Sequence, residues 1–330
     1  MSDSFELIVI GSYVQDHAWL TDRFPVMGET RRALDFNSGP GGKGFNQAVA
    51  AHRQGARTLF IGAVGDDHLG RIAQSFARDE RLPANWQIVA DASTAASSIV
   101  VDPQGRNQIV VALGANERLD PDFLIGRRDA MVGARLMLLQ LENNPEATAA
   151  AIAMAGDLSI PVVLNPAPVR DDFDAELLHG VTLLTPNETE FALLLERVAG
   201  TTIDPARVAD LSDDALHAYS RKLGVPTVVV TLGEHGCFVS HAASSPFATG
   251  DADRYRVPAE AVNAVDSTGA GDAFNGALAA ALVQFADRPF RDAVEHANRS
   301  AALSTETIGT APAMPTAAQV AGRFVAQGPI

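Results

Sequence analysis

The feature that most constrains the fold is a short apolar run that recurs along the chain at helix-length intervals. The first run, Leu7-Ile8-Val9-Ile10-Gly11, is rich in β-branched residues and ends at a glycine. Such a run is typical of a strand that is buried on both faces. Similar runs follow at 58–64, 136–141, 162–164, 181–185 and 227–232. Strands in this rhythm predict a doubly wound, mostly parallel α/β sheet flanked by helices.

The segments between these runs predict both the helices and an appendage. Alanine-rich, amphipathic stretches at 47–54, 69–79, 145–155, 188–198 and 272–285 are expected to be helices. Polar and apolar residues alternate instead at about 13–37 and 97–113, which favours hairpins. We expect these two segments to form a small β lid on a single domain that spans residues 1–330. An exposed edge strand in such a lid would allow a homodimer.

Charge and composition exclude several classes of partner. The formal net charge of -15 opposes binding to nucleic acid, because that affinity depends on Lys and Arg neutralising phosphates. The single cysteine, Cys237, cannot form an intramolecular disulfide, which fits a reducing compartment. The first residues are acidic, and no apolar run approaches the roughly 20 residues that span a bilayer. We therefore expect a cytoplasmic protein with no membrane partner.

One glycine-rich run near the C-terminus combines an anion site with a carboxylate. Gly269, Ala270 and Gly271 allow a tight turn whose N–H groups point into one concavity at the start of a helix. The helix dipole favours negative charge there, such as that of a transferring phosphoryl group. Asp272 follows in the first turn, where a carboxylate can accept the proton of an attacking hydroxyl. The sequence thus predicts a general base beside an anion hole.

A structural alternative exists for the same residues, because an aspartate in a first turn also complements a helix dipole and glycines form ordinary turns. For a short Gly-x-Gly-Asp motif this alternative is the better interpretation. The longer run, with Asp266 and Thr268 before it and Asn275-Gly276 after it, favours chemistry.

The run from 266 to 276 resembles the C-terminal signature of the ribokinase, or pfkB, family of carbohydrate kinases. A second match lies at 39–48, where Gly-Pro-Gly-Gly-Lys-Gly-Phe-Asn-Gln-Ala is similar to the family's sugar-binding loop, and further matches lie at 186–190 and 231–236. The resemblance covers essentially the whole chain and is closest to the ribokinase branch. It implies transfer of the γ-phosphoryl group of ATP to a hydroxyl of a small sugar, with ribose as the first candidate.

The expected sugar site collects residues from three parts of the chain. Asp16 and Glu142 each come just after a predicted strand, at the sheet end where ligands of α/β proteins bind. Surface or loop roles are the alternative for these carboxylates and for Lys43, but the resemblance favours sugar binding. The expected substrate-binding residues are Asp16, Gly42, Lys43, Gly44, Asn46 and Glu142. A P-loop is excluded, because Gly44 stands where that motif needs Ser or Thr to hold magnesium.

The expected nucleotide site uses the middle and the C-terminal half of the chain. Asn187 and Glu190 are one helical turn apart, so both can face magnesium-bound phosphates, although capping of the helix by Asn187 is an alternative. Magnesium keeps several waters, so no dedicated protein cage is expected. By resemblance, the nucleotide-binding residues are Asn187, Glu190, Thr231, Gly233, Gly236, Gly271 and Asn298.

The resemblance also implies a site for potassium or another monovalent cation. Its expected ligands are Asp266, Thr268, Ser304, Thr307 and Gly309. Ala313 departs from this pattern, because ribokinases usually carry serine at the matching position and alanine has no side-chain oxygen.

Two further departures concern the sugar. Val14 stands where ribokinases carry an asparagine and cannot hydrogen-bond a hydroxyl, and Phe45 replaces a small residue, so we expect a reshaped pocket. Another small alcohol, such as fructose, a deoxysugar or a nucleoside, is therefore an alternative substrate. A non-catalytic sugar or nucleotide sensor with the same fold is an alternative of a different class.

Overall fold

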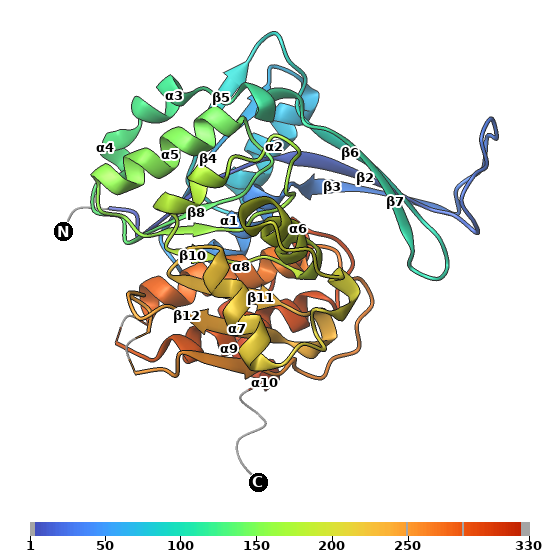
Figure 1. The fold of residues 1–330 in the computed structure, drawn as a ribbon. Coiled ribbons are helices and arrows are strands. Elements are labelled where there is room, and N and C mark those ends of the chain that lie inside the picture. The colour runs from blue at the N-terminus through green and yellow to red at the C-terminus, as the bar shows by residue number, and fades with distance from the viewer. Residues whose placement is uncertain (1–3, 249, 286, 325–330) are drawn as a thin grey trace.

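The computed structural model describes residues 4–248, 250–285 and 287–324, and it contains a large sheet, two layers of helices and a small second sheet (Figure 1). The large sheet has the strand order β13-β12-β11-β10-β9-β8-β1-β4-β5. Pairing from β11 to β5 is parallel, whereas β12 and β13 pair antiparallel at one edge. These strands are β1 (Leu7–Ile10), β4 (Thr58–Gly65), β5 (Ala84–Val89), β8 (Leu136–Leu139), β9 (Val162–Leu164), β10 (Leu183–Leu184), β11 (Thr227–Thr231), β12 (Cys237–His241) and β13 (Arg254–Val257).

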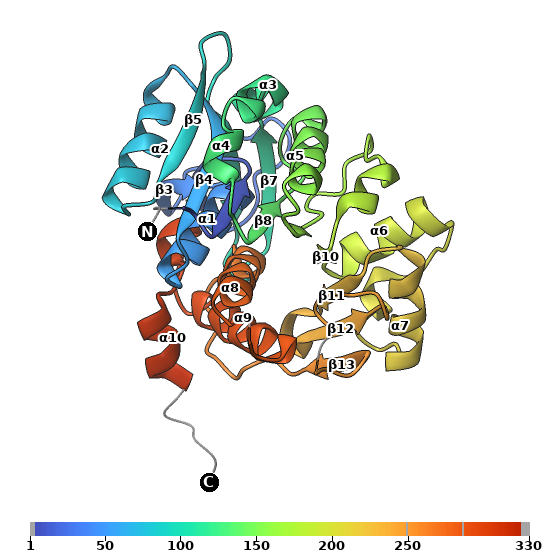
Figure 2. The same cartoon turned by 90° about the vertical axis from the view of Figure 1, so that its left-hand side faces the viewer.

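Helices cover both faces of the large sheet (Figure 2), because its central strands are apolar on both sides. Leu7 and Val9 of β1 pack against one layer, and Ile8 and Ile10 pack against the other. The first layer is formed by α1 (Lys43–Arg53), α2 (His68–Asp79), α8 (Ala270–Gln284) and α9 (Phe290–Ser304). The second is formed by α3 (Pro121–Ile125), α4 (Arg128–Met131), α5 (Pro145–Asp157), α6 (Glu188–Ala199) and α7 (Asp213–Lys222).

The remaining helix, α10 (Ala317–Phe324), contacts α9. Five short 3-10 helices complete the described elements: η1 (Gly114–Arg118), η2 (Ala175–Gly180), η3 (Pro205–Arg207), η4 (Gly233–His235) and η5 (Ala311–Ala313). In the part of the chain that is described, no helix is long and apolar enough to cross a membrane.

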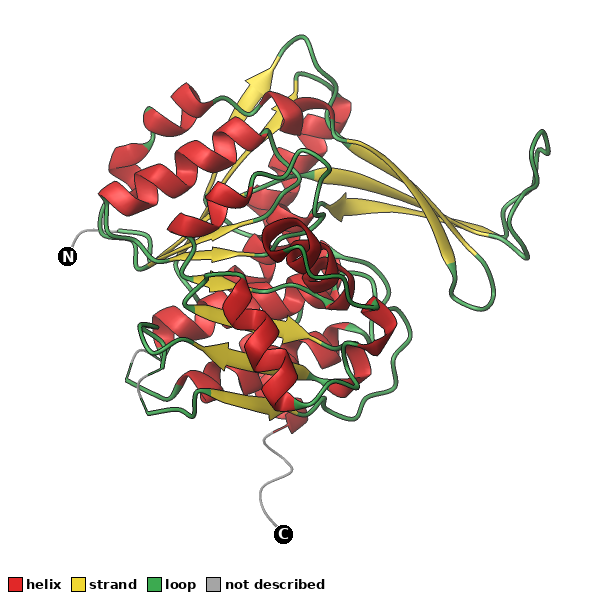
Figure 3. Cartoon of the chain, in the orientation of Figure 1, coloured by secondary structure: helices red, strands yellow, loops and turns green. Residues whose placement is uncertain are grey.

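The small sheet projects from the body as an arm (Figure 3). Its order is β3-β2-β6-β7, with the strands β2 (Val14–Leu20), β3 (Asp35–Gly41), β6 (Ala96–Val101) and β7 (Asn107–Ala112). Two antiparallel pairs, β2 with β3 and β6 with β7, are joined by parallel pairing of β2 with β6. The second pair turns at Asp102, whose carbonyl accepts a 2.9 Å hydrogen bond from the N–H of Gly105.

The fold class predicted from the sequence is confirmed, but several boundaries differ. α1 begins at Lys43 instead of residue 47, because Gly42, with φ 89°, ends the preceding strand and caps the helix. β3 extends to Gly41, so residues 39–41 of the expected sugar-binding loop are strand and residues 43–48 are helix. The helices and strands predicted from the sequence do not include α3, α4, α7, α9 or α10, nor the strands β5, β12 and β13.

Candidate active site

The two glycine-rich signatures meet although they are 226 positions apart in the sequence. Asp272 lies in the first turn of α8 and faces α1, and 8% of its surface is exposed. Asn46 Nδ2 donates to Asp272 Oδ2 at 2.8 Å, and Gln47 Nε2 donates to Asp272 Oδ1 at 2.9 Å. Both carboxylate oxygens are therefore held by amide donors from one neighbouring helix.

Close backbone contact at the start of α1 explains the glycines there. A side chain at Gly42 would place its Cβ 2.5 Å from the backbone nitrogen of Val14, and one at Gly44 would place it 2.4 Å from the Cα of Gly11. Neither contact is sterically possible without moving the backbone. These glycines let α1 start directly against the β1–β2 connection, and this brings Lys43, Asn46 and Gln47 to the carboxyl edge of the sheet.

Of the three amides that the sequence predicts for anion binding at the start of α8, two are free within the described chain and one is used within the turn. The N–H of Ala270 donates to the carbonyl of Ser267 at 3.2 Å, so it is used within the turn. Gly269 is the N-cap residue with φ 79°, and for the N–H groups of Gly269, Gly271 and Asp272 the described chain provides no acceptor. These amides at the positive end of the helix dipole can bind an anion.

A cavity of about 190 Å³ opens at this helix start. Seven residues that were predicted for the site line it: Lys43, Asn187, Glu190, Thr231, Gly269, Gly271 and Asp272. The lining also includes Asn165, Ala167, Thr185 and Asn275. The predicted base, the predicted anion-binding amides and part of the predicted nucleotide site therefore share one cavity.

The charges in this cavity influence one another. Burial raises the pKa of Asp272 above the ordinary value, while the charge of Lys43 and the hydrogen bonds from Gln47 and Asn46 act to lower it. Burial also raises the pKa of Glu190. For Lys43, burial acts to lower the pKa, but the carboxylates of Asp272, Glu142, Glu190 and Asp16 oppose it, and the net shift is upward. Lys43 is thus a charged ammonium among carboxylates.

The two carboxylates predicted for the sugar are held by hydroxyls and a backbone amide. Glu142 Oε2 accepts from Ser12 Oγ at 2.6 Å and from the N–H of Lys43 at 3.0 Å. Asp16 Oδ1 accepts from Ser97 Oγ at 2.6 Å, and Oδ2 accepts from Thr310 Oγ1 at 3.2 Å. Neither carboxylate lines the cavity at Asp272, but both act on the pKa of Lys43, so all three side chains lie in one electrostatic neighbourhood.

Sequence reasoning missed a chain of polar side chains behind Asp272. Gln140 Nε2 donates to Gln47 Oε1 at 2.6 Å, and Gln47 Nε2 also donates to Asn165 Oδ1 at 3.0 Å. Asn165 Nδ2 donates to the carbonyl of Thr185 at 3.0 Å. Thr185 Oγ1 then donates to Asn275 Oδ1 at 2.5 Å.

A signal for this chain was present in the sequence. Three of these residues come directly after the last residue of a strand: Gln140, Asn165 and Thr185. This position is at the carboxyl edge of the sheet, where ligands of parallel sheets bind. The same rule predicts Glu142, and it applies equally to these two amides and to the threonine.

On the nucleotide side, the capping alternative for Asn187 is what the geometry shows. Asn187 Oδ1 accepts from the N–H of Glu190 at 2.8 Å, and the N–H of Asn187 donates to Glu190 Oε2 at 2.9 Å. This reciprocal pair is a capping box at the start of α6. Both residues still line the cavity, so capping fixes them at its edge.

The other residues predicted for the nucleotide lie on β11, on the turn after it and on α9. Thr231 lines the cavity, whereas Gly233 and Gly236 form the tight turn from β11 to β12 and are not in its lining. Asn298 is buried on α9, and its Nδ2 donates to the carbonyls of Val257 at 3.4 Å and Pro258 at 3.2 Å. Its amide therefore ties α9 to the end of β13.

The predicted cation loop is brought together around Asp266. Asp266 Oδ1 accepts from the N–H of Thr268 at 2.9 Å, and Oδ2 accepts from the N–H of Gly309 at 3.1 Å. The hydroxyl of Ser304 instead donates to the carbonyl of Ala301 within α9, and the N–H of Thr307 donates to the carbonyl of Ser304. Within residues 4–248, 250–285 and 287–324, no three His, Cys, Asp or Glu side chains are grouped to hold a metal ion.

The two departures noted in the sequence have different outcomes. Phe45 does not line the cavity at α8 and is fully buried, with its ring centroid 5.3 Å from that of Tyr13 and 5.3 Å from that of Phe60. The expectation that Phe45 reshapes the pocket directly is therefore wrong, because its ring fills the core. Val14 is buried and lies two residues before Asp16 on β2, so the two side chains share a face of that strand.

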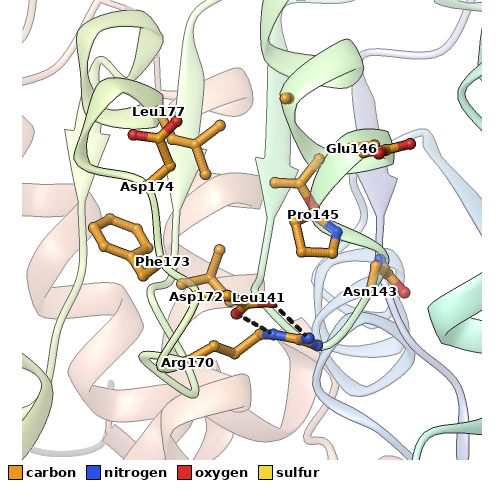
Figure 4. Close-up of a pocket in the computed structure, with 11 residues that line it drawn as sticks. Leu141, Asn143, Pro145, Glu146, Arg170, Asp172, Phe173, Asp174 and Leu177 are labelled. Carbon is orange, nitrogen blue, oxygen red and sulfur yellow. Dashed lines mark hydrogen bonds and ion pairs between the residues drawn. The ribbon is translucent and has the colours of Figure 1, made fainter.

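A second cavity of about 210 Å³ lies elsewhere, between α5 and the segment 170–177 (Figure 4). Pro145 and Phe173 lie on its two sides, and Arg170 pairs with Asp172 at its edge. None of the predicted site residues lines it. The predicted base and the predicted anion-binding glycines line the cavity at α8 and not this one.

Comparisons with known proteins agree with this geometry. The model of the pfkB family of carbohydrate kinases matches residues 4–317. A ribokinase from Mus musculus is 33% identical over 94% of this chain and 91% of its own length. A deoxyribokinase from Salmonella typhi is 33% identical over 95% of this chain and 97% of its own length.

Among solved structures, that of Arabidopsis thaliana ribokinase complexed with ribose and ATP superposes with a TM-score of 0.80. It is 27% identical and covers 97% of this chain and 98% of its own. The family model matches nearly the whole chain. In the structure, the buried carboxylate of Asp272 and the helix-start residues Gly269 and Gly271 line one cavity. The chain belongs to the pfkB family of carbohydrate kinases, ATP-dependent phosphotransferases with an alcohol group as acceptor.

Proposed function

We propose that this kinase phosphorylates D-ribose, with Asp272 as the general base. The observation that carries the proposal is the position of Asp272: its carboxylate shares a cavity with the Gly269 and Gly271 amides and with Lys43. An alcohol between that carboxylate and a phosphate on those amides would be in line for transfer. A sensor has no need of such a base.

Each group has a role in the proposed transfer. Asp272 accepts the proton of the sugar hydroxyl as its oxygen attacks phosphorus. The amides of Gly269 and Gly271, at the positive end of α8, stabilise the charge on the phosphoryl oxygens. Lys43 is held as an ammonium by the carboxylates around it and adds positive charge at the same place.

Magnesium bound with ATP would bridge the phosphates and neutralise part of their charge. Asn187 and Glu190 line the cavity on the nucleotide side and fit contact with the water shell of that ion. Thr231, Gly233, Gly236 and Asn298 are proposed for the rest of the nucleotide. Asn298 would act through the β13 segment that its amide holds.

The sugar is proposed to bind between Asp16 and Glu142, beside Gly42, Gly44 and Asn46. Asn46 Oδ1 is buried with no hydrogen-bond partner in the described residues. Such an unpaired acceptor costs about 1–3 kcal/mol, which a sugar hydroxyl would offset after a small shift of the amide. The small sheet carries Asp16 on β2, so we propose that the sheet acts as a lid that closes over the sugar.

The test is a panel of alcohols in an ATP-consumption assay with the intact protein. We expect kcat/KM for D-ribose to exceed that for fructose and for nucleosides at least tenfold, with ATP consumption near zero when no sugar is present. A smaller preference would contradict the choice of ribose. Binding of ribose and ATP without any turnover would instead support a sensor.

One observation favours a second substrate, 2-deoxyribose. Val14 is a buried apolar side chain on the same strand face as Asp16, so that part of the wall cannot hydrogen-bond a hydroxyl. A sugar that lacks the hydroxyl facing Val14 has no hydroxyl to leave without a hydrogen-bond partner there. In the same panel, a kcat/KM for 2-deoxyribose above that for ribose would establish this alternative.

We also propose that potassium or another monovalent cation activates the enzyme through the loop around Asp266. The carboxylate of Asp266 connects the turn before Gly269 with Gly309, so a cation there would brace the anion-binding amides. Thr268, Ser304, Thr307 and Gly309 are its proposed neighbours, largely through carbonyl oxygens. Activity in potassium should exceed that in tetramethylammonium at equal ionic strength, and equal rates would contradict this site.

We propose that the protein forms a homodimer through the small sheet, because that sheet has an exposed apolar surface. All six residues of β7 are exposed, including Ile109, Val110 and Val111, and Phe36 of β3 is half-exposed. Apolar side chains on an arm of this kind fit a second copy of the chain. Light scattering of the intact protein should give twice the monomer mass, and Val110→Lys should lower it.

We place the protein in the cytoplasm because it uses ATP and has a buried free thiol at Cys237.

A further inference from the structure

One short segment near the C-terminus touches both ends of the proposed site. The carbonyl of Thr305 accepts from the N–H of Asp266 at 3.0 Å, and the N–H of Gly309 donates to Asp266 Oδ2 at 3.1 Å. The next residue, Thr310, reaches the small sheet instead: its Oγ1 lies 3.2 Å from Asp16 Oδ2 and 3.0 Å from the carbonyl of Pro40. Segment 305–310 therefore links the turn before the anion-binding amides to the carboxylate proposed for the sugar.

Asp16 depends on this link for its orientation. Its two oxygens together accept about four hydrogen bonds, and hydroxyls of the protein supply one from Ser97 of β6 and one from Thr310, whose single proton is shared with the carbonyl of Pro40. The two directions that remain are free for sugar hydroxyls. A carboxylate fixed at both oxygens presents those directions in one geometry, whereas a carboxylate held at one oxygen can rotate.

The packing around Thr310 leaves little freedom for its hydroxyl. Only 9% of the residue is exposed. A Cβ added at Gly41 would lie 2.0 Å from Asp16 Oδ2 and 3.1 Å from Thr310 Oγ1, so the absence of a side chain at Gly41 makes room for this contact. Burial raises the pKa of Asp16, and the hydrogen bonds from Ser97 and Thr310 act against that shift and favour the ionised form.

We propose that Thr310 is a positioning residue for the sugar: its hydroxyl fixes Asp16 and connects the sugar site to the loop around Asp266. The inference rests on the proposed function, because it assigns Asp16 to the sugar. It predicts that loss of the hydroxyl weakens sugar binding while ATP binding and the phosphoryl-transfer step change little.

A purely structural role is the alternative, in which Thr310 only donates to Pro40 and holds the chain in place. Two variants of this residue separate the roles. Thr310→Val keeps the shape and removes the hydroxyl, whereas Thr310→Ser keeps the hydroxyl and removes a methyl group. Thr310→Ala serves as a second hydroxyl-free variant if Thr310→Val does not fold.

The experiment measures KM for the sugar, KM for ATP and kcat in each variant, with the sugar Kd from calorimetry. We expect Thr310→Val to raise sugar KM and Kd about tenfold, as for loss of a hydrogen bond to a charged group, with ATP KM and kcat within about threefold of wild type. Thr310→Ser should restore sugar KM to within about threefold.

Three outcomes would overturn the inference: an unchanged sugar KM in Thr310→Val, an equal rise in Thr310→Ser, or a parallel rise in ATP KM. In each of these the wild type still phosphorylates the sugar, so the proposed function stands. If the wild type binds and phosphorylates no sugar, both the proposed function and this inference fail.

Discussion

The two sheets of the molecule differ in how far their strands are buried. Every residue of β1 and β4 in the large sheet is buried, whereas every residue of β7 in the small sheet is exposed. The large sheet is covered by helices on both faces and can hold a side chain in one position without a ligand. The small sheet has few strands and little cover, so we expect it to gain order from a sugar or a second copy.

The two aspartates of the proposed mechanism show what this difference means for catalysis. Asp272 is fixed by amides of α1, which packs on the large sheet. Asp16 belongs to the small sheet and is held by hydroxyls from β6 and from segment 305–310. The proposed base is therefore positioned by the core, and the proposed sugar contact is assembled from separate segments. Changes near Asp272 should act on kcat, and changes near Asp16 should act on sugar KM.

The largest expected effect is on the base itself. Asp272→Asn removes the proton acceptor and should lower kcat about 10²–10⁴-fold, with the Kd for ATP within about threefold. Steady-state kinetics and calorimetry measure the two quantities. A variant that keeps more than about a tenth of wild-type kcat would argue against Asp272 as the base.

The next effect compares two phenylalanines, one from each sheet region. Phe45→Ala leaves a cavity among the aromatic rings of the core and should lower the free energy of unfolding by about 3–5 kcal/mol. Phe36 on β3 is 51% exposed, and Phe36→Ala should cost less than about 1 kcal/mol. Urea titration of both variants is the measurement, and similar losses would contradict the contrast between the sheets.

A smaller effect separates the supports of the two aspartates. Gln47→Leu removes a donor to Asp272 and should lower kcat about 10- to 100-fold through misplacement of the base. Ser97→Ala removes a donor to Asp16 and should raise sugar KM about fivefold with kcat nearly unchanged. Kinetics with both substrates varied test the pair. If both variants changed the same parameter, the division between base and sugar contact would be wrong.

The smallest effect is a shift in a pH profile. Burial raises the pKa of Asp272 above 3.8, the ordinary aspartate value, and the base must be ionised to act. As pH falls through this raised pKa, Asp272 is protonated and kcat should fall, so the acid limb should lie above the ordinary value. The charge of Lys43 lowers that pKa, so Lys43→Met should move the limb to higher pH. If the acid limb of the kcat profile does not move in Lys43→Met, the charge of Lys43 does not lower the pKa of Asp272.

The sequence allowed much of this architecture to be predicted, for local reasons. Buried strands such as 7–10 and 58–65 are apolar runs long enough to recognise, and the rhythm of strand and helix predicts a parallel sheet. The edge strands β12 and β13 lacked that rhythm because they pair antiparallel. α9 and α10 were not predicted, although α9 carries an apolar face whose buried residues include Phe290, Val294 and Ala297.

For the site, the sequence alone determined which chemical groups are present. The glycines before Asp272 and the residues after Gly42 are local patterns, because backbone turns and helix starts depend on neighbouring residues. The tertiary structure decided which groups meet. It placed Asn46 and Gln47 on Asp272, used the amide of Ala270 within its own turn, buried Phe45 in the core and brought Thr310 to Asp16. Such contacts join residues far apart in the chain, and their geometry depends on how the packed layers fit together, which no local pattern records.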